Sequence, residues 1–83
     1  MEGLNMLTEE EVLKNLSNAL SDSSLDINST AEEIENWDSL GQLSILTCLA
    51  NLTDGKSDQI PNLDEIKSVR EIIELLKGNN LLA

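Results

Sequence analysis

The sequence predicts an all-α domain: a bundle of four helices, with a long loop between the first and second helices and a short third helix. Its 83 residues suffice for one small domain with a modest core. Apolar residues make up 40% of the chain, but Trp37 is the only aromatic one, so the core has to be aliphatic. One proline, four glycines and few clusters of β-branched residues favour helices over a sheet.

The first helix is expected at residues 8–21. Thr8 and Glu11 form a capping box, and Glu9 and Glu10 suit the positive end of the helix dipole. The apolar residues that follow recur at helical spacing and define one buried stripe: Val12, Leu13, Leu16 and Leu20. The polar run at residues 21–24 ends this pattern.

Residues 22–38 have little periodicity and are expected to form a long connection. Its apolar residues, which we expect to fix the loop onto the core, are Leu25, Ile27, Ile34 and Trp37. Thr30 and Glu33 can cap a short helical turn within it. Asp26, Asn28 and Thr30 alternate like the start of a calcium-binding loop, but Ala31 stands where such a loop needs glycine. The pattern therefore argues against a calcium site.

The second helix is expected at residues 39–53, a stretch without Asp, Glu, Lys or Arg. Its side chains fall on two faces: Leu40, Leu43 and Thr47 on the side of Ser39, and Ile45, Leu49 and Leu52 on another, with Leu46 between them. A helix that is apolar on more than one face is deeply buried or uses the second face for a partner. Because so small a domain cannot bury a helix on all sides, we expect a partner-binding face. The alternative is a central helix whose Leu40 is covered by the loop.

Two further helices complete the predicted bundle. Gly55, in a turn-forming stretch, is expected to end the second helix, and Pro61 can open a short third helix at 62–66. Ser68 caps a fourth helix at 69–77, whose buried stripe is Val69, Ile72, Ile73 and Leu76. Lys77 suits the negative end of this helix, Gly78 is expected to end it, and the tail at 79–83 is expected to be loose.

Charge and cysteine content limit the partners and the compartment. Sixteen acidic and five basic residues give a net charge of −11, which argues against nucleic acid and anionic membranes. The charge fits partners with basic surfaces, or simply an acidic solvated surface. Ser39–Thr53 is too short and too polar to span a bilayer, and the acidic N-terminus shows no signal peptide. The single cysteine, Cys48, suits a reducing compartment, so we expect a cytoplasmic protein.

Ser39 is the strongest candidate site. It follows Asp38 where the loop turns into the second helix, and a first helical turn has unpaired N–H groups at the positive end of the dipole. A phosphate attached there is held favourably. Catalysis by Ser39 requires a general base, and the chain has no histidine and no second cysteine. We therefore expect an attachment point and no enzymatic activity, with Cys48 a small buried residue.

The run Asp38-Ser39-Leu40, near the centre of a small acidic helical chain, resembles the attachment motif of acyl carrier proteins. The long loop, the apolar second helix and Ile60-Pro61 ahead of the final helix extend the resemblance over residues 8–77. It implies that Ser39 carries 4′-phosphopantetheine, transferred from coenzyme A by a phosphopantetheinyl transferase. Acyl groups are then held on its thiol as thioesters, loaded by acyl-activating or acyl-transferring enzymes, on a monomeric carrier.

The resemblance also implies roles along the second helix. The positions concerned are Asp38 and Leu40 as motif flanks, Leu40, Leu43 and Thr47 for partner contact, and Ile45, Leu46 and Leu49 for an acyl pocket or core. Many fatty-acid carriers have acids where this chain reads Gly41, Ser44, Ala50 and Asn51. This difference favours a specialised carrier, in lipid or secondary-metabolite biosynthesis, over a general fatty-acid carrier. Two alternatives stay open: an aminoacyl or peptidyl carrier, and an unmodified acidic helical adaptor that binds a partner through the second helix.

Overall fold

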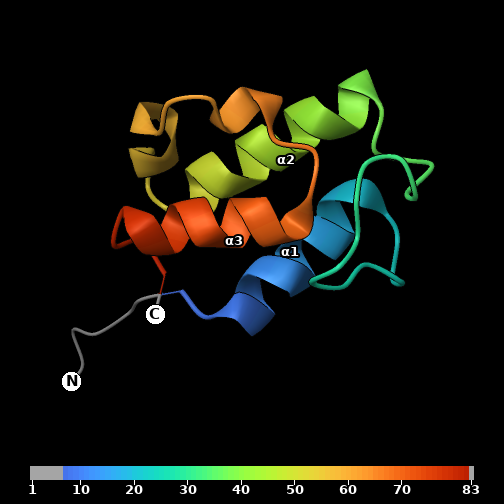
Figure 1. Cartoon of the computed structure of the whole chain (residues 1–83), viewed down its shortest axis with the longest axis horizontal. Helices are drawn as coiled ribbons and strands as arrows, with labels where there is room; N and C mark the ends of the chain where they lie inside the picture. The colour runs from blue at the N-terminus through green and yellow to red at the C-terminus, as the bar shows by residue number, and fades with distance from the viewer. Residues whose placement is uncertain (1–6, 83) are drawn as a thin grey trace.

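The computed structural model describes residues 7–82 and confirms an all-α fold (Figure 1). These residues form three α-helices, α1 (Glu9–Leu20), α2 (Ser39–Leu52) and α3 (Val69–Gly78), and two 3₁₀ turns, η1 (Lys56–Gln59) and η2 (Leu63–Glu65). A four-helix bundle is not confirmed, because the third helix expected at 62–66 is the single turn η2. Asn62, with a left-handed φ of 66°, precedes η2 and the extended Ile66 follows it, which leaves room for one turn only. η1 has no counterpart among the predicted elements.

α1 begins as its capping residues predict. The Thr8 hydroxyl accepts a hydrogen bond from the Glu11 N–H, and the Glu11 carboxylate accepts one from the Thr8 N–H. The predicted stripe is confirmed, with Val12, Leu16 and Leu20 buried and Leu13 packed against the core. Ser21, in the left-handed conformation at φ 54°, closes the helix one residue before the predicted end.

The loop between α1 and α2 is fixed to the bundle, as predicted. Its apolar side chains pack into the core or against it: Leu25, Ile34 and Trp37 are buried, and Ile27 is half-buried. Backbone hydrogen bonds join the loop to the start of α3. The Ala31 N–H donates to the Lys67 carbonyl at 2.8 Å, and the Val69 N–H donates to the Ser29 carbonyl at 3.0 Å. Residues 31–33 form the predicted turn.

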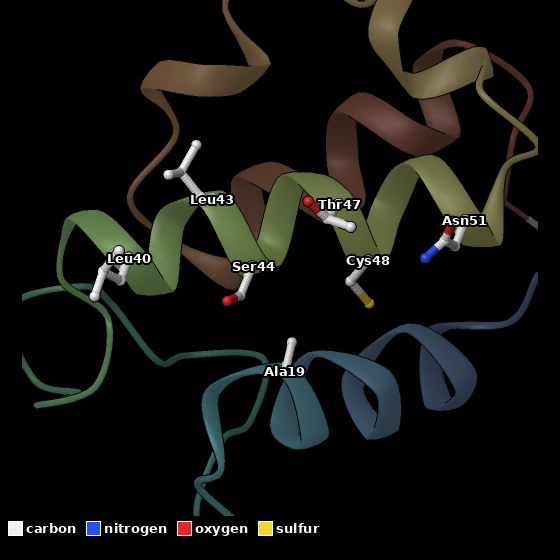
Figure 2. Close-up of a pocket in the computed structure, with 7 residues that line it drawn as sticks. All are labelled: Ala19, Leu40, Leu43, Ser44, Thr47, Cys48 and Asn51. Atoms are coloured by element: carbon white, nitrogen blue, oxygen red, sulfur yellow. The ribbon is translucent and has the colours of Figure 1, made fainter.

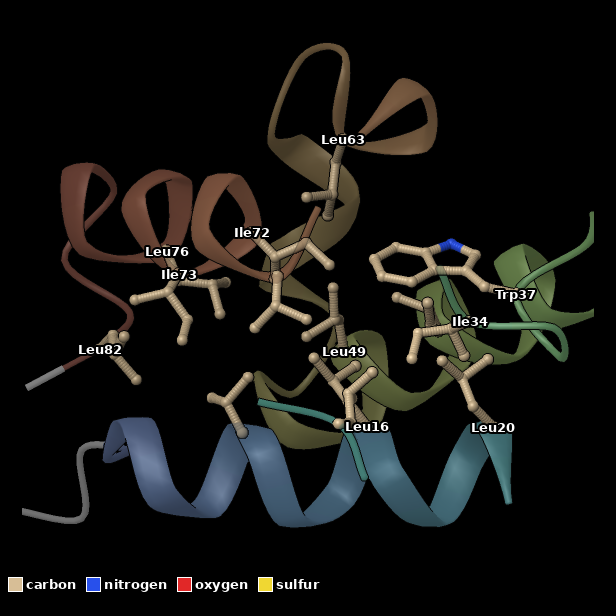
Figure 3. Close-up of a cluster of buried hydrophobic side chains, with 14 of the residues drawn as sticks. Leu16, Leu20, Ile34, Trp37, Leu49, Leu63, Ile72, Ile73, Leu76 and Leu82 are labelled. Carbon is tan, nitrogen blue, oxygen red and sulfur yellow. The ribbon is translucent and has the colours of Figure 1, made fainter. Parts of the chain in front are cut away.

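The core lies where the three helices, the loop and the segment of η1 and η2 meet (Figure 3). Its buried apolar side chains are Val12, Leu16, Leu20, Leu25, Ile34, Trp37, Ile45, Leu49, Ile60, Leu63, Val69, Ile72, Ile73, Leu76 and Leu82. All except Trp37 are aliphatic, as the composition requires. α2 contacts α1, η1 and η2, so it is held from more than one side.

α3 begins at the predicted cap. The Ser68 hydroxyl accepts a hydrogen bond from the Glu71 N–H, and the predicted apolar stripe is buried. The helix runs one residue further than predicted, because Gly78 is its last residue and Asn79 caps it. Lys77 in the last turn forms an ion pair with Glu9 at the start of α1.

The tail after α3 differs from the expectation of a loose end at 79–83. The Leu81 N–H donates to the Leu76 carbonyl at 2.9 Å, and Leu82 is only 5% exposed. Leu82 also forms an isolated β-bridge with Leu7. Leu82 is therefore part of the core and Leu81 packs against it, whereas Asn79 and Asn80 are exposed; Ala83 lies outside the described residues.

Candidate functional site

Ser39 is the first residue of α2, and its side chain is exposed. The preceding residue, Asp38, is the N-cap: its carboxylate accepts a 2.9 Å hydrogen bond from the Gly41 N–H. Its carbonyl accepts a second one, at 2.8 Å, from the Gln42 N–H. An N-cap of this type contributes about 1 kcal/mol to the stability of a helix. Ser39 thus lies on the surface at the positive end of the α2 dipole.

Gly41 allows the chain before Ser39 to approach α2 closely. A Cβ atom at this buried position would overlap the backbone carbonyl of Asn36 and would also touch the side chain of Leu20. The side chain of Asn36 in turn donates a 2.9 Å hydrogen bond to the Leu20 carbonyl at the end of α1. This role of Gly41 was not predicted, although a glycine inside an apolar helix is a signal of close backbone approach.

Gln42 joins the loop, α2 and the η2 segment. Its Oε1 accepts a 2.6 Å hydrogen bond from Trp37 Nε1, and its Nε2 donates to the carbonyls of Asp64 and Ile66 at 3.0 and 3.1 Å. Gln42 is buried, so these bonds satisfy an amide that is largely removed from water. The role of Gln42 was not predicted, because its partners Asp64 and Ile66 are distant in the sequence.

The predicted partner-binding residues lie together on one side of α2. Leu40 is 74% exposed and Leu43 is 60% exposed, and Thr47 is also exposed. They line an open groove of about 460 Å³, called the α1–α2 groove below, with Ala19 of α1 and with Ser44, Cys48 and Asn51 of α2. In Figure 2, Leu43 lies on the side of α2 that faces away from α1. Ser44 and Cys48 point toward Ala19, and the lining has no charged side chain. The alternative in which the loop covers Leu40 is therefore wrong.

The predicted acyl-pocket residues divide between the core and a second cavity. Ile45 and Leu49 are fully buried core residues, whereas Leu46 is half-buried. Leu46 lines a cavity of about 310 Å³, called the η-side cavity below, together with Ser57, Asp58, Ile60, Leu63 and Asp64. Ser57 is 1% exposed, and its hydroxyl has no hydrogen-bond partner within residues 7–82. Its role as a buried polar residue was not anticipated from the sequence.

Cys48 in the α1–α2 groove and Asp22 just after α1 have shifted pKa values. Burial raises the pKa of the Cys48 thiol, so this thiol keeps its proton more firmly than an exposed one. Hydrogen bonds from the side chain and the backbone of Ser24 lower the pKa of Asp22.

Among residues 7–82, no three His, Cys, Asp or Glu side chains come together as a metal site would need. The site therefore offers an exposed hydroxyl beside an uncharged groove, whose lining includes a thiol with a raised pKa.

Comparison with known proteins does not assign the chain to a family. No family model matches it, and no match was found among curated proteins or solved structures. Within the described residues, no helix has the length and apolar character needed to cross a membrane. A functional assignment therefore has to rest on the residues and the geometry around Ser39.

Proposed function

We propose that this chain is an acyl carrier protein that holds acyl groups on a 4′-phosphopantetheine arm attached to Ser39. The observation that carries the proposal is the position of Ser39, exposed at the first residue of a helix that Asp38 caps. In this proposal the described fold is an acyl-carrier-like bundle, with η2 in place of a short third helix and a long loop leading to the serine.

The residues around Ser39 fit this group. Ser39 is exposed, so a transferase can remove the hydroxyl proton and join Oγ to the pantetheine-side phosphorus of the coenzyme A diphosphate. The P–O bond of the diphosphate bridge breaks, and adenosine 3′,5′-bisphosphate leaves. The product phosphate lies at the positive end of the α2 dipole. Asp38 fixes the start of the helix and offers a charge to the transferase. The bound group supplies a thiol for thioester chemistry. The protein itself holds this group and presents it to partner enzymes.

The uncharged surface of α2 favours dedicated partners. Residues 39–53 contain no Asp, Glu, Lys or Arg, and two leucines on the exposed side are largely open to solvent. A partner enzyme therefore has to meet an apolar face with little electrostatic steering. We assign Leu40, Leu43 and Thr47 to this contact, and a specialised pathway instead of general fatty-acid synthesis. Whether the cargo is an acyl, an aminoacyl or a peptidyl group is a question of which enzyme loads the thiol.

A second candidate function is an unmodified adaptor that binds a partner protein through α2. The exposed side chains of Leu40 and Leu43 favour it, because large apolar side chains side by side on a surface often mark an interface. The binding of an adaptor to its partner does not require modification of Ser39. Ser39→Ala separates the two functions, since it removes the attachment point and leaves the two leucines in place.

The test is the intact mass of the protein after incubation with coenzyme A and a broad-specificity phosphopantetheinyl transferase. We expect the mass to increase by one phosphopantetheine in the parent and to stay unchanged in Ser39→Ala. Ser44→Ala is the matched control: it removes another hydroxyl on α2 and should be modified like the parent. Circular dichroism verifies that each variant is folded. If no transferase of several tested modifies the folded parent, the carrier proposal is rejected and the adaptor function is favoured.

A further inference from the structure

The α1–α2 groove begins beside the attachment serine. Leu40, the residue after Ser39, lines one end of the groove, and Asn51 lines it near the end of α2. These two residues are separated by about 16 Å along the helix axis, at 1.5 Å per residue. An extended pantetheine chain attached to Ser39 is long enough to follow most of this path. The groove is therefore within reach of the group that the proposed function puts on Ser39.

The order of side chains along the groove matches the order of chemical groups along the arm. Leu40 and Leu43 are the lining residues of α2 nearest to Ser39, and Ser44, Thr47, Cys48 and Asn51 follow along the helix. Starting from its phosphate, the arm has two methyl groups on one carbon and then two amides before the thiol. Apolar groups thus meet the leucines, and the amides meet hydroxyl and amide side chains.

The polar side chains of the groove are available for new hydrogen bonds. Within residues 7–82, the side chains of Ser44, Thr47 and Asn51 make no hydrogen bond to another protein group, whereas the side chains of Asn15 and Asn36 donate to backbone carbonyls. The lining also contains no carboxylate that would repel the phosphate of the arm. The groove thus offers uncharged donors and acceptors in a row.

We propose that, in the unloaded protein, the phosphopantetheine arm lies along the α1–α2 groove, with its amides on Ser44, Thr47 and Asn51. This inference rests on the proposed function. Leu40 and Leu43 then serve both the arm and the partner, so a docking enzyme displaces the arm from the groove and receives its thiol. Storage of the arm and its delivery are coupled through the same two side chains.

The η-side cavity is the competing location and is less suited to the arm. Asp58 and Asp64 contribute carboxylates to its lining. On that side of α2, Gln42 lies between Ser39 and Leu46, and its hydrogen bonds to Asp64 and Ile66 tie α2 to the η2 segment there. The arm would have to pass this connection to enter the cavity. The α1–α2 groove needs no such rearrangement.

The first test compares amide and side-chain NMR shifts of the unmodified protein and of the protein with the arm attached. We expect shifts at Ser44, Thr47 and Asn51, and at Ala19 across the groove. Shifts confined to residues next to Ser39 would mean an arm free in solvent, and shifts at Ser57 and Leu63 would place it in the η-side cavity. Either outcome overturns the inference while the attachment itself remains established by mass.

The second test traps the arm thiol by oxidation with glutathione disulfide, which accepts the two hydrogens that the two thiols lose. Two variants carry one exposed cysteine each in a Cys48→Ser background: Thr47→Cys in the groove and Asp58→Cys at the η-side cavity. We expect the intramolecular disulfide to form at least about tenfold faster in the groove variant, because the effective concentration of the thiol is higher there. Equal rates, or a faster Asp58→Cys variant, would overturn the inference. If Ser39 takes up no arm, the proposed function and this inference fall together.

Discussion

The indole N–H of Trp37 donates a 2.6 Å hydrogen bond to Oε1 of Gln42, and both side chains are buried. Trp37 is the last apolar residue of the loop, and Gln42 is in the first turns of α2, so the bond spans the Asp38–Ser39 step. The amide nitrogen of Gln42 donates hydrogen bonds to the backbone carbonyls of Asp64 and Ile66, in and just after η2. The position of Ser39 is thus set by the core side chain before it and by the buried amide after it.

Gln42→Leu should destabilise the protein, although leucine fills a similar volume. The substitution leaves the buried N–H of Trp37 without an acceptor, which costs about 1–3 kcal/mol. Urea unfolding followed by Trp37 fluorescence and by circular dichroism measures the change in the free energy of unfolding. Gln59→Leu, at an exposed position of η1, is the matched control and should change stability little. Equal effects of the two substitutions would show that the hydrogen bond contributes nothing.

Replacing glycine by alanine should have opposite effects at two helical positions. Gly41→Ala forces the Cβ against the Asn36 carbonyl, and we expect a loss of about 1–3 kcal/mol, as for overpacked cores. Gly78→Ala meets open space at the end of α3 and should be neutral or stabilise by up to about 1 kcal/mol, because alanine favours helix. Thermal unfolding of both variants checks this. A Gly41→Ala protein as stable as the parent would refute the close approach.

Ser57→Ala should stabilise the protein by roughly 1 kcal/mol, because it removes a buried hydroxyl that has no partner within residues 7–82. Thr53→Val is the contrasting variant. The Thr53 hydroxyl donates to the Leu49 carbonyl at 2.7 Å and accepts from the Ser57 N–H at 2.9 Å, so its removal should cost about 1–3 kcal/mol. Urea midpoints of the two variants should move in opposite directions. A decrease for Ser57→Ala would mean that its hydroxyl is hydrogen-bonded in solution.

The helices could be predicted closely because their signals are local. The caps Thr8 and Ser68 and the apolar stripes lie within a few residues of each other, and helix ends fall within one residue of the prediction. The exposed face of α2 was also predictable, because a helix apolar on two sides cannot bury both in so small a domain. The predicted position of Ser39 at the start of α2 follows from the same local reasoning.

The rest depends on partners that are distant in the sequence. Gln42 bonds to a carbonyl 22 residues away and Asn36 to one 16 residues away, so neither role has a local pattern. The expected third helix shortens to η2 because Asn62 adopts a left-handed conformation, and the tail is held by burial of Leu82. Such features follow from tertiary packing, which overrides local propensity.

Leu43→Gln should weaken modification of Ser39 by a phosphopantetheinyl transferase without unfolding the carrier. Leu43 is 60% exposed, so stability should change little, while loss of one apolar contact at an interface costs roughly tenfold in kcat/KM. Glu74→Gln, on an exposed part of α3, is the control and should be modified like the parent. Equal kcat/KM values for both variants would show that Leu43 does not contribute to docking of the transferase.

Cys48 should react slowly with iodoacetamide at neutral pH, because burial raises the pKa of its thiol and thiolate is the reactive form. Mass spectrometry at a series of pH values measures the rate of alkylation. The rate for Cys48 should begin to rise at a higher pH than the rate for the exposed cysteine of Thr47→Cys in a Cys48→Ser background. The folded state holds this proton more tightly than the unfolded chain. The stability contributed by Cys48 is therefore complete below the pKa of the unfolded thiol and is lost as the pH rises through the folded pKa. Cys48→Ser should remove that part of the alkaline decline, and coincident rate profiles for the two cysteines would contradict the shift.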